Sequence, residues 1–231
     1  MTRTCRRPYP TRPYPGRVVF PGDGGRGAVP KKVDHEQRRR QIAGALLRIA
    51  GARGLQAATM REVAAEAGVS VRLVQYYFES KLELLLGAVP FLGEQMSARM
   101  VSRIAEESGG ASPPPPRAVL EGALTAVMPL DDEGRRLWRT YNAFFLLVLD
   151  DPGFAERVGS PHHSATDRFL AEHITRAQEA GEIDPGLDAL TTAAGLFTMA
   201  QGLGSGVMAG HRDGAEARAI LVYHLDRLFR R

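Results

Sequence analysis

The segment spanning residues 59–81, TMREVAAEAGVSVRLVQYYFESK, constrains the fold more strongly than any other part of the chain. Thr59 and Glu62 have the spacing of a capping box, in which side chains at a helix start bond free backbone N–H groups. Gly68 follows where that helix has to end, because glycine enters the left-handed conformation at little cost. The first part of the segment therefore predicts one short helix and a tight turn.

Two further capping signals follow the turn. Ser70 can cap a second helix that ends near Phe78, because a serine oxygen accepts bonds from the first free N–H groups. Ser80 and Glu83 repeat the capping-box spacing and predict the start of a third helix. Two short helices, a glycine turn and a third helix are thus expected in close succession.

The side chains of this segment separate into two faces. The apolar positions that would point inward from the two helices and the turn are Val63, Ala67, Val69, Val74 and Phe78, with the small Ala64 allowing a close crossing. The outer face of the second helix would carry Val71, Arg72, Gln75 and Tyr76. Arginine and glutamine can both bond base edges bidentately in the major groove. The pattern favours a DNA-binding helix-turn-helix. Two core helices of an ordinary bundle are the alternative.

With RRRQIAGALLRIAGARGLQAAT before it and KLELL after it, this segment resembles the N-terminal domain of TetR-family transcriptional regulators, from about Glu36 to Leu86. The segment from Trp138 to Pro152, followed by ITRAQEAGEIDPGLDALTTAAGLF, is similar to the C-terminal domains of betaine-inhibitor-type members. The resemblance implies a homodimer that binds a pseudo-palindromic operator in double-stranded DNA. It also implies a small-molecule effector, usually one that releases a repressor.

The resemblance carries DNA-binding roles to particular residues. Arg72 and Gln75 would contact base edges, and the neighbouring positions would contact thymine methyl groups or phosphates. The full predicted DNA-binding set is Thr59, Arg61, Ser70, Val71, Arg72, Leu73, Gln75, Tyr76, Tyr77 and Lys81. The family often has a small residue at position 72 and tyrosine at position 75, so the operator sequence does not follow from the resemblance.

The charge of the chain is unevenly distributed. Up to Lys81 it has 16 lysines and arginines against 6 acidic residues, and from Leu82 onward it has 14 against 20. A basic front part, with a net charge of +10, favours a polyanionic partner for that part alone. A basic face that is merely solvated is the alternative.

We expect three regions along the chain. Residues 1–33 are rich in Pro, Gly and Arg and predict a disordered basic tail, with a non-specific DNA-binding arm or a native start at Val29 as alternatives. Residues 34–86 form the predicted DNA-binding domain. Residues 87–231 form the predicted ligand-binding and dimerisation domain. The single cysteine, Cys5, fits a reducing cytosol, and no secretory signal is visible, so we expect a cytoplasmic protein.

The pattern along the chain predicts an all-α fold. Apolar residues recur at helical spacing from about 34–53, 80–107, 117–128, 132–149 and 188–209. A longer helix, either continuous or broken near Pro161, reaches about Ala180, and a last helix starts at Asp213 and ends near Phe229. Pro90 either kinks the long helix that starts at Ser80 or breaks it at Val89. Residues 112–116, SPPPP, are expected to form a stiff linker.

Aromatic residues in the second half indicate either a ligand pocket or an ordinary core. The candidate pocket residues are Trp138, Tyr141, Phe144, Phe145 and Phe169. The resemblance favours the pocket, because effectors of the family bind between helices of the C-terminal domain.

The last two helices are the candidate dimer contact. Their apolar stripes contain Leu196, Met199, Leu203, Val207, Leu221, Leu225 and Leu228. Each glycine inside a helix costs about 1 kcal/mol relative to alanine, so the several glycines of 195–206 suggest close approach to another helix. Packing within one subunit is the alternative.

Other classes of function have weak support. The pattern at 204–209, GSGVMA, has no preceding strand and so lacks the turn of a dinucleotide site. His162 and His163 with Asp167 are a weak metal candidate, and we expect no metal, no cofactor and no enzymatic activity. The uncharged stretch 189–210 is long enough to span a bilayer but contains polar residues and glycines, so we expect a buried helix and no membrane contact. The leading hypothesis is a ligand-responsive DNA-binding regulator. A helical small-molecule-binding or scaffold protein without specific DNA binding is the alternative.

Overall fold

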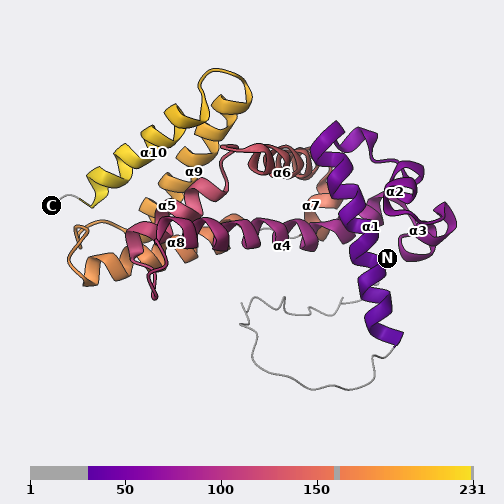
Figure 1. The fold of residues 1–231 in the computed structure, drawn as a ribbon, viewed down its shortest axis with the longest axis horizontal. Helices are drawn as coiled ribbons and strands as arrows, with labels where there is room; N and C mark the ends of the chain where they lie inside the picture. Colours follow the sequence, from indigo (N-terminus) through magenta and orange to yellow (C-terminus); the bar gives the residue numbers. More distant parts are fainter. Residues whose placement is uncertain (1–30, 159–161, 230–231) are drawn as a thin grey trace, which may run out of the picture.

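The computed structural model describes residues 31–158 and 162–229, and every regular element within them is helical. The elements in chain order are α1 (Lys31–Arg53), the short 3-10 helix η1 (Leu55–Ala57), α2 (Met60–Ala67), α3 (Val71–Tyr77), α4 (Lys81–Glu107), α5 (Pro116–Ala126), α6 (Asp132–Asp150), α7 (Pro152–Val158), α8 (His162–Glu179), α9 (Ala189–Met208) and α10 (Gly214–Leu228). Figure 1 shows α1–α3 at one end of the molecule and α8–α10 at the other, with α4 and α6 between them. The predicted all-α fold is confirmed. Residues 1–30 of the predicted disordered tail lie outside the described residues, whereas residues 31–33 belong to the first turn of α1.

The starts and stops of the first helices follow from local chemistry. The Thr59 side chain accepts a bond from the Glu62 N–H at 3.2 Å, and Gly68 ends α2 with a φ of 65°. Ser70 caps α3 through the Leu73 N–H at 3.1 Å, and Ser80 caps α4 at the same distance. The predicted two-helix turn and all three predicted caps are confirmed.

The predicted capping boxes at Thr59 and Ser80 form only one of their two bonds: the cap side chain accepts from the glutamate N–H, but the glutamate side chain does not accept from the cap N–H. The Glu62 carboxylate accepts a hydrogen bond from Arg53 at 2.7 Å, and the Glu83 carboxylate accepts one from Arg157 at 2.5 Å. Each glutamate is therefore used for a link to another helix rather than for the backbone of its own cap. In the described part of the chain, the complete capping box is the one that starts α10 at Asp213.

Helix α4 continues through Pro90, which excludes a break at Val89, one of the two predicted alternatives. The proline ring removes one backbone bond, but packing supports the helix on both sides of it. Leu84, Leu85 and Leu92 are buried against the N-terminal helices, and the end of α4 crosses α5 closely. A single helix therefore connects the two ends of the molecule.

The buried apolar residues form two cores. The first core joins α1–α4 to Phe144 of α6 and Phe154 of α7. The second core joins α5, α8, α9 and α10, and Met100 and Ile104 of α4 pack against it. The first core therefore extends beyond the helix-turn-helix, because α6 and α7 share it.

A buried arginine on α4 holds the turn between α5 and α6. The Arg99 side chain is 4% exposed, and its Nε donates to the Ala126 carbonyl at 3.0 Å. Its two terminal nitrogens each donate at 2.9 Å, one to Asp131 and one to Glu133. Asp131 in turn accepts from the Gly134 N–H at 2.7 Å and caps α6. The start of α6 is thus fixed to the middle of α4.

Candidate DNA-binding surface and effector pocket

Helix α3 presents its polar residues outward. Val74 is fully buried beneath the helix, whereas Arg72 and Gln75 are exposed and Tyr76 is 69% exposed. The two side chains predicted to read bases therefore lie on the free face of this helix. The partly buried Val71 and Leu73 lie beside them near the start of α3.

The basic side chains at this end of the molecule differ in whether they are paired. Three arginines of α1 form ion pairs with glutamates of α4 or α2, namely Arg40 with Glu94, Arg48 with Glu66 and Arg53 with Glu62. Within the described residues, Arg61, Arg72 and Lys81 form no hydrogen bond or ion pair with the protein. The unpaired positive charges are therefore concentrated at the starts of α2, α3 and α4.

Two residues of α1 support the end of α3 and were not predicted from the sequence. Arg39 donates to the Tyr77 carbonyl at 3.1 Å, and its guanidinium lies 4.5 Å from the centre of the Phe78 ring. His35 packs edge-on against Tyr77 with ring centres 5.2 Å apart. Helix α3 is thus held from α1 at the end opposite to its Ser70 cap. No local spacing could have indicated this contact, because the partners lie far apart in the chain.

Two adjoining cavities lie where α4, α6 and α9 face one another. The cavity of about 320 Å³, which we call the polar lobe, lies between α6 and α9. The cavity of about 350 Å³, which we call the apolar lobe, lies between α4, α6 and α7. Six residues line both lobes, namely Met96, Ala126, Val127, Tyr141, Phe145 and Phe197.

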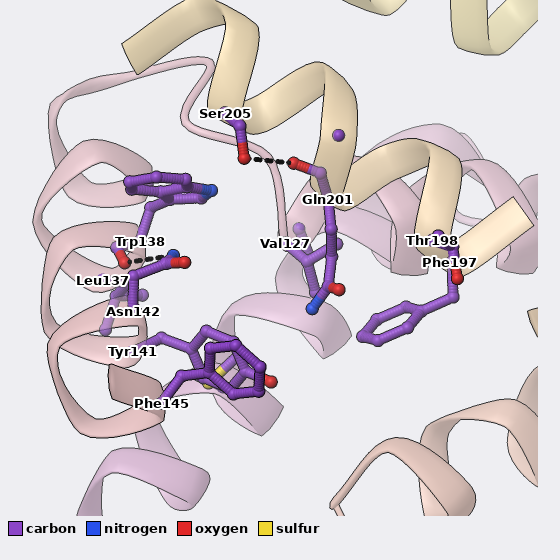
Figure 2. Close-up of a pocket in the computed structure, with 14 residues that line it drawn as sticks. Val127, Leu137, Trp138, Tyr141, Asn142, Phe145, Phe197, Thr198, Gln201 and Ser205 are labelled. Carbon is purple, nitrogen blue, oxygen red and sulfur yellow. Dashed lines mark hydrogen bonds between the residues drawn. The ribbon is translucent and has the colours of Figure 1, made fainter. Parts of the chain in front are cut away.

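The polar lobe combines aromatic rings with neutral hydrogen-bonding groups. Figure 2 shows Trp138, Tyr141 and Asn142 of α6 opposite Gln201 and Ser205 of α9. The Asn142 amide nitrogen donates to the Trp138 carbonyl at 2.9 Å, so the amide oxygen is left to accept bonds in the lobe. Burial raises the pKa of Tyr141, although a hydrogen bond with Gln201 opposes the rise. The phenol is therefore neutral at physiological pH.

Gly204 makes room for the indole of Trp138. A Cβ at this position would lie 2.8 Å from the indole nitrogen and 3.0 Å from a carbon of Pro129. At least this glycine of α9 therefore serves packing within one chain. Gly195 and Gly202 are different, because a Cβ added to either would meet nothing within 4 Å.

The apolar lobe is lined by aliphatic, aromatic and methionine side chains from both cores. Leu92, Phe144 and Phe154 belong to the first core, whereas Phe197 belongs to the second core and Met100 packs against it. The lobe therefore lies at the junction of the two cores.

Four of the five predicted pocket residues line the two lobes, namely Trp138, Tyr141, Phe144 and Phe145. Phe169 lies elsewhere: it packs against the second core, with its ring 4.9 Å from that of His173. Its assignment to the pocket is corrected, because an aromatic residue on a helix does not reveal which core it joins. The sequence prediction missed Asn142, Gln201 and Phe197.

The predicted dimer residues are largely used within one chain. Leu196, Leu203, Val207, Leu221 and Leu225 are buried in the second core, while Met199 and Leu228 are partly buried against it. These side chains hold α9 and α10 to the rest of the chain. The exposed apolar residues of the same helices are Leu190, 51% exposed, and Tyr223, 55% exposed.

The remaining candidates gain no support from the described residues. The side chains of His162 and His163 lie outside the described residues, and the described part holds no acidic, histidine or cysteine cluster suited to a metal ion. None of the helices in ranges 31–158 and 162–229 has the length and apolarity needed to cross a bilayer. The uncharged stretch 189–210 is mostly α9, whose inner face is buried in the second core, as predicted.

Comparison with known proteins agrees with this arrangement. The family model "Bacterial regulatory proteins, tetR family" matches residues 42–88, which hold the helix-turn-helix. The model "BetI-type transcriptional repressor, C-terminal" matches residues 116–230, which hold α5–α10. The chain belongs to the TetR family. The resemblance drawn from residues 59–81 and from the C-terminal segments is confirmed.

Curated TetR-family relatives match over part of their length. The regulator PksA of Bacillus subtilis is 40% identical over 72 residues, which cover 31% of this chain and 35% of PksA. The regulator BetI of Rhizobium meliloti is 41% identical over 61 residues, which cover 26% of this chain and 30% of BetI. The aligned segments thus span about a third of each curated relative.

Solved structures share the fold over most of the chain. A transcriptional regulator from Rhodococcus sp. Rha1 is 25% identical, with a TM-score of 0.66 over 82% of this chain and 95% of that chain. A TetR regulator from Haloarcula marismortui is 20% identical, with a TM-score of 0.67 over 84% and 100%. A regulator from Saccharomonospora viridis, solved in complex with choline, is 22% identical, with a TM-score of 0.67 over 83% and 96%. The TetR fold therefore covers both ends of the molecule.

Proposed function

We propose that the protein is a sequence-specific DNA-binding repressor that a small molecule releases from its operator. The observation that carries this proposal is the free face of α3, where Arg72 and Gln75 are exposed and Arg72 is unpaired. Both side chains can bond base edges in a major groove. The unpaired Arg61 and Lys81 flank them and suit phosphate contacts, which position a protein on DNA without reading its sequence.

The proposed operator is pseudo-palindromic, because we expect the protein to act as a homodimer. Two recognition helices read half-sites that are separated by about one turn of B-DNA. The outer surfaces of α9 and α10 are the proposed contact between the two copies, with Leu190 and Tyr223 as its exposed apolar residues. The buried leucines of these helices would support the contact from beneath.

Helix α6 offers a physical route from the pocket to the DNA-binding end. One face of it lines the polar lobe with Trp138 and Tyr141. The opposite face meets α1 so closely that a Cβ on Gly51 would lie 3.2 Å from Thr140 and 3.3 Å from Arg136. An effector that fits better when α6 is displaced would shift the population towards dimers with unsuitably spaced recognition helices.

The test is binding to DNA that flanks the protein's own gene, measured across a salt series against random duplex. We expect a strong preference for the flanking DNA that persists as salt rises, because base contacts add to the salt-dependent phosphate contacts. Equal affinity for both duplexes would support the alternative of a helical ligand-binding or scaffold protein. We expect no catalytic activity, and a protein that acts on DNA in this way would work in the cytoplasm.

A further inference from the structure

We propose that the effector is an uncharged amphiphile with a hydrogen-bonding end in the polar lobe and an apolar chain in the apolar lobe. This inference rests on the proposed function, because it names the ligand of the same pocket. The juxtaposition of the two lobes carries it. They adjoin along walls that include Tyr141, Phe145 and Phe197, so one elongated molecule can reach from one lobe into the other.

The polar lobe selects a hydrogen-bonding end. Figure 2 shows the side chain of Gln201 reaching from α9 into the space opposite α6, with the amide of Asn142 on the other side. The Ser205 hydroxyl donates to the backbone carbonyl of Gln201 at 3.1 Å, so the Ser205 oxygen can still accept a bond. A ligand hydroxyl can both donate to such oxygens and accept from an amide N–H, which suits this mixed lining.

The apolar lobe selects a hydrocarbon chain. Its lining consists mainly of aliphatic, aromatic and methionine side chains, with Ser97, Tyr141 and Thr166 as its hydroxyl-bearing members. Methionine adapts to irregular apolar shapes, and Met96 and Met100 both contribute to the lining. A chain placed here would lose contact with water and gain close packing, which is the main source of affinity for such ligands.

Charge decides against ionic end groups. Among the described residues that line either lobe there is no Asp, Glu, Lys, Arg or His. An anion moved into this lining would lose its hydration without meeting a positive partner among the described lining residues. A cation would gain partial compensation from the faces of Trp138 and Tyr141, but it would meet no carboxylate among the described lining residues. A neutral end group pays neither cost.

The head-group test uses the unmodified full chain. Trp138 is the chain's one tryptophan and lines the polar lobe, so its fluorescence reports on occupancy directly. The probes are 1-decanol, decanoate and decyltrimethylammonium, which share a chain length. At neutral pH, 1-decanol is kept below its solubility limit and each ionic probe below its micelle-forming concentration. We expect 1-decanol to bind at least about tenfold more tightly than either ion. Equal or tighter binding of decanoate or of the ammonium probe would overturn the proposal.

A second series tests the two-lobe placement. The shorter 1-butanol should bind at least about tenfold more weakly than 1-decanol, because it lacks the methylenes that fill the apolar lobe. Ala155→Phe, which narrows the apolar lobe, should weaken 1-decanol but not 1-butanol, and Gln201→Ala should weaken both. Gln95→Ala, on the exposed side of α4, is the matched control and should change neither. Equal losses from Ala155→Phe for both alcohols would contradict the placement. Thermal unfolding shows whether each variant is folded. The comparison of 1-decanol with 1-butanol on the wild-type protein does not depend on the variants.

Binding of DNA is measured separately, so the two proposals fail in different ways. The fluorescence series contains no DNA, and loss of operator preference would overturn the proposed function without changing the head-group order. If 1-decanol binds most tightly of the three probes but leaves operator affinity unchanged, the ligand class is supported and the effector role is overturned. Release of the operator by an ionic probe, with none by 1-decanol, would overturn the inference and leave the repressor intact.

Discussion

The first core contains the DNA-reading helices together with α6 and α7, whereas the second core contains no residue of the helix-turn-helix. Ile42, Leu46 and Ile49 of α1 are buried in the first core, and the helices around this core carry the unpaired basic residues on their outer surface. The second core holds α9 and α10, the helices proposed to meet another copy. The apolar lobe lies between them. A ligand in the apolar lobe contacts both cores at once, so its binding energy can depend on the position of the first core relative to the second.

The largest effect is expected at the closest helix crossing of the second core. A Cβ on Gly122 would lie 2.6 Å from the backbone N and Cα of Ile104, and backbone atoms cannot move aside cheaply. Gly122→Ala should lower the free energy of unfolding by about 3 kcal/mol, measured by urea denaturation.

Gly51→Ala is the matched change in the first core. Its added methyl would be 3.2 Å from the Thr140 hydroxyl and 3.3 Å from Arg136 atoms, so the clash is milder. We expect about 1 kcal/mol of destabilisation there. A larger loss from Gly51→Ala than from Gly122→Ala would reverse the ranking of the two contacts.

The Arg99 cluster fixes α6 to α4, so removing it should loosen the junction between the cores. Arg99→Ala leaves the Ala126 carbonyl and the Glu133 carboxylate without the partner that Arg99 supplies, and it leaves Asp131 with Arg103 alone as its counter-charge. We expect a loss of about 2 kcal/mol, below the usual cost of breaking a buried pair because both carboxylates are partly exposed. Arg135→Ala, on the exposed side of α6, is the control and should cost less than about 0.5 kcal/mol. Similar losses from both changes would show that the cluster does not support the junction.

On the DNA side, Arg72 and Lys81 should separate base reading from phosphate contact. Arg72→Ala should cost about 1 to 2 kcal/mol on the preferred duplex and relax the base preference, because it removes a contact to base edges. Lys81→Ala should weaken all duplexes similarly and flatten the salt slope by about one. Affinity measured on a panel of duplexes across a salt series checks both. Indistinguishable profiles would refute the assignment of separate roles.

The DNA-binding end could be predicted from the sequence because its signals are local. Each cap connects residues three apart, as Thr59 with Glu62 and Ser70 with Leu73, and Gly68 marks the turn directly. The support that Arg39 gives to Tyr77 spans 38 positions and left no pattern to detect.

The pocket could be predicted only in part, because it is assembled from helices distant in sequence. The aromatic residues of α6 were found because they share one helical face. Asn142 and Gln201 were missed because a polar residue on a helix ordinarily faces solvent, and only the fold places α6 opposite α9. The apolar stripes of α9 and α10 fit an inner core as well as a dimer contact, and periodicity does not distinguish the two.

Acid should weaken the attachment of α6 to α4. Burial alone would raise the pKa of Asp131, but hydrogen bonds from Arg99 and Gly134 and the charges of Arg99 and Arg103 outweigh burial and lower it. A pKa that is lower in the folded state gives stability that is present above the unfolded value and lost as pH falls through the folded one. We therefore expect unfolding to become easier below about pH 4, and less steeply so in Arg99→Ala. A wild-type slope equal to that of the variant would contradict this link.

The smallest effect is expected from two helix glycines with open surroundings. A Cβ on Gly44 of α1 would meet only an Arg48 nitrogen at 3.6 Å, and one on Gly195 of α9 would meet nothing within 4 Å. Within a single chain, alanine at either position should stabilise its helix by about 0.5 to 1 kcal/mol. Gly195 also lies on the outer surface of α9, where the second copy is proposed to pack, and there the extra methyl should raise the dimer dissociation constant several-fold. Gly44→Ala should leave that constant unchanged. Sedimentation equilibrium measures dimerisation and urea denaturation measures stability, and a Gly195→Ala dimer as tight as wild type would place the contact away from the middle of α9.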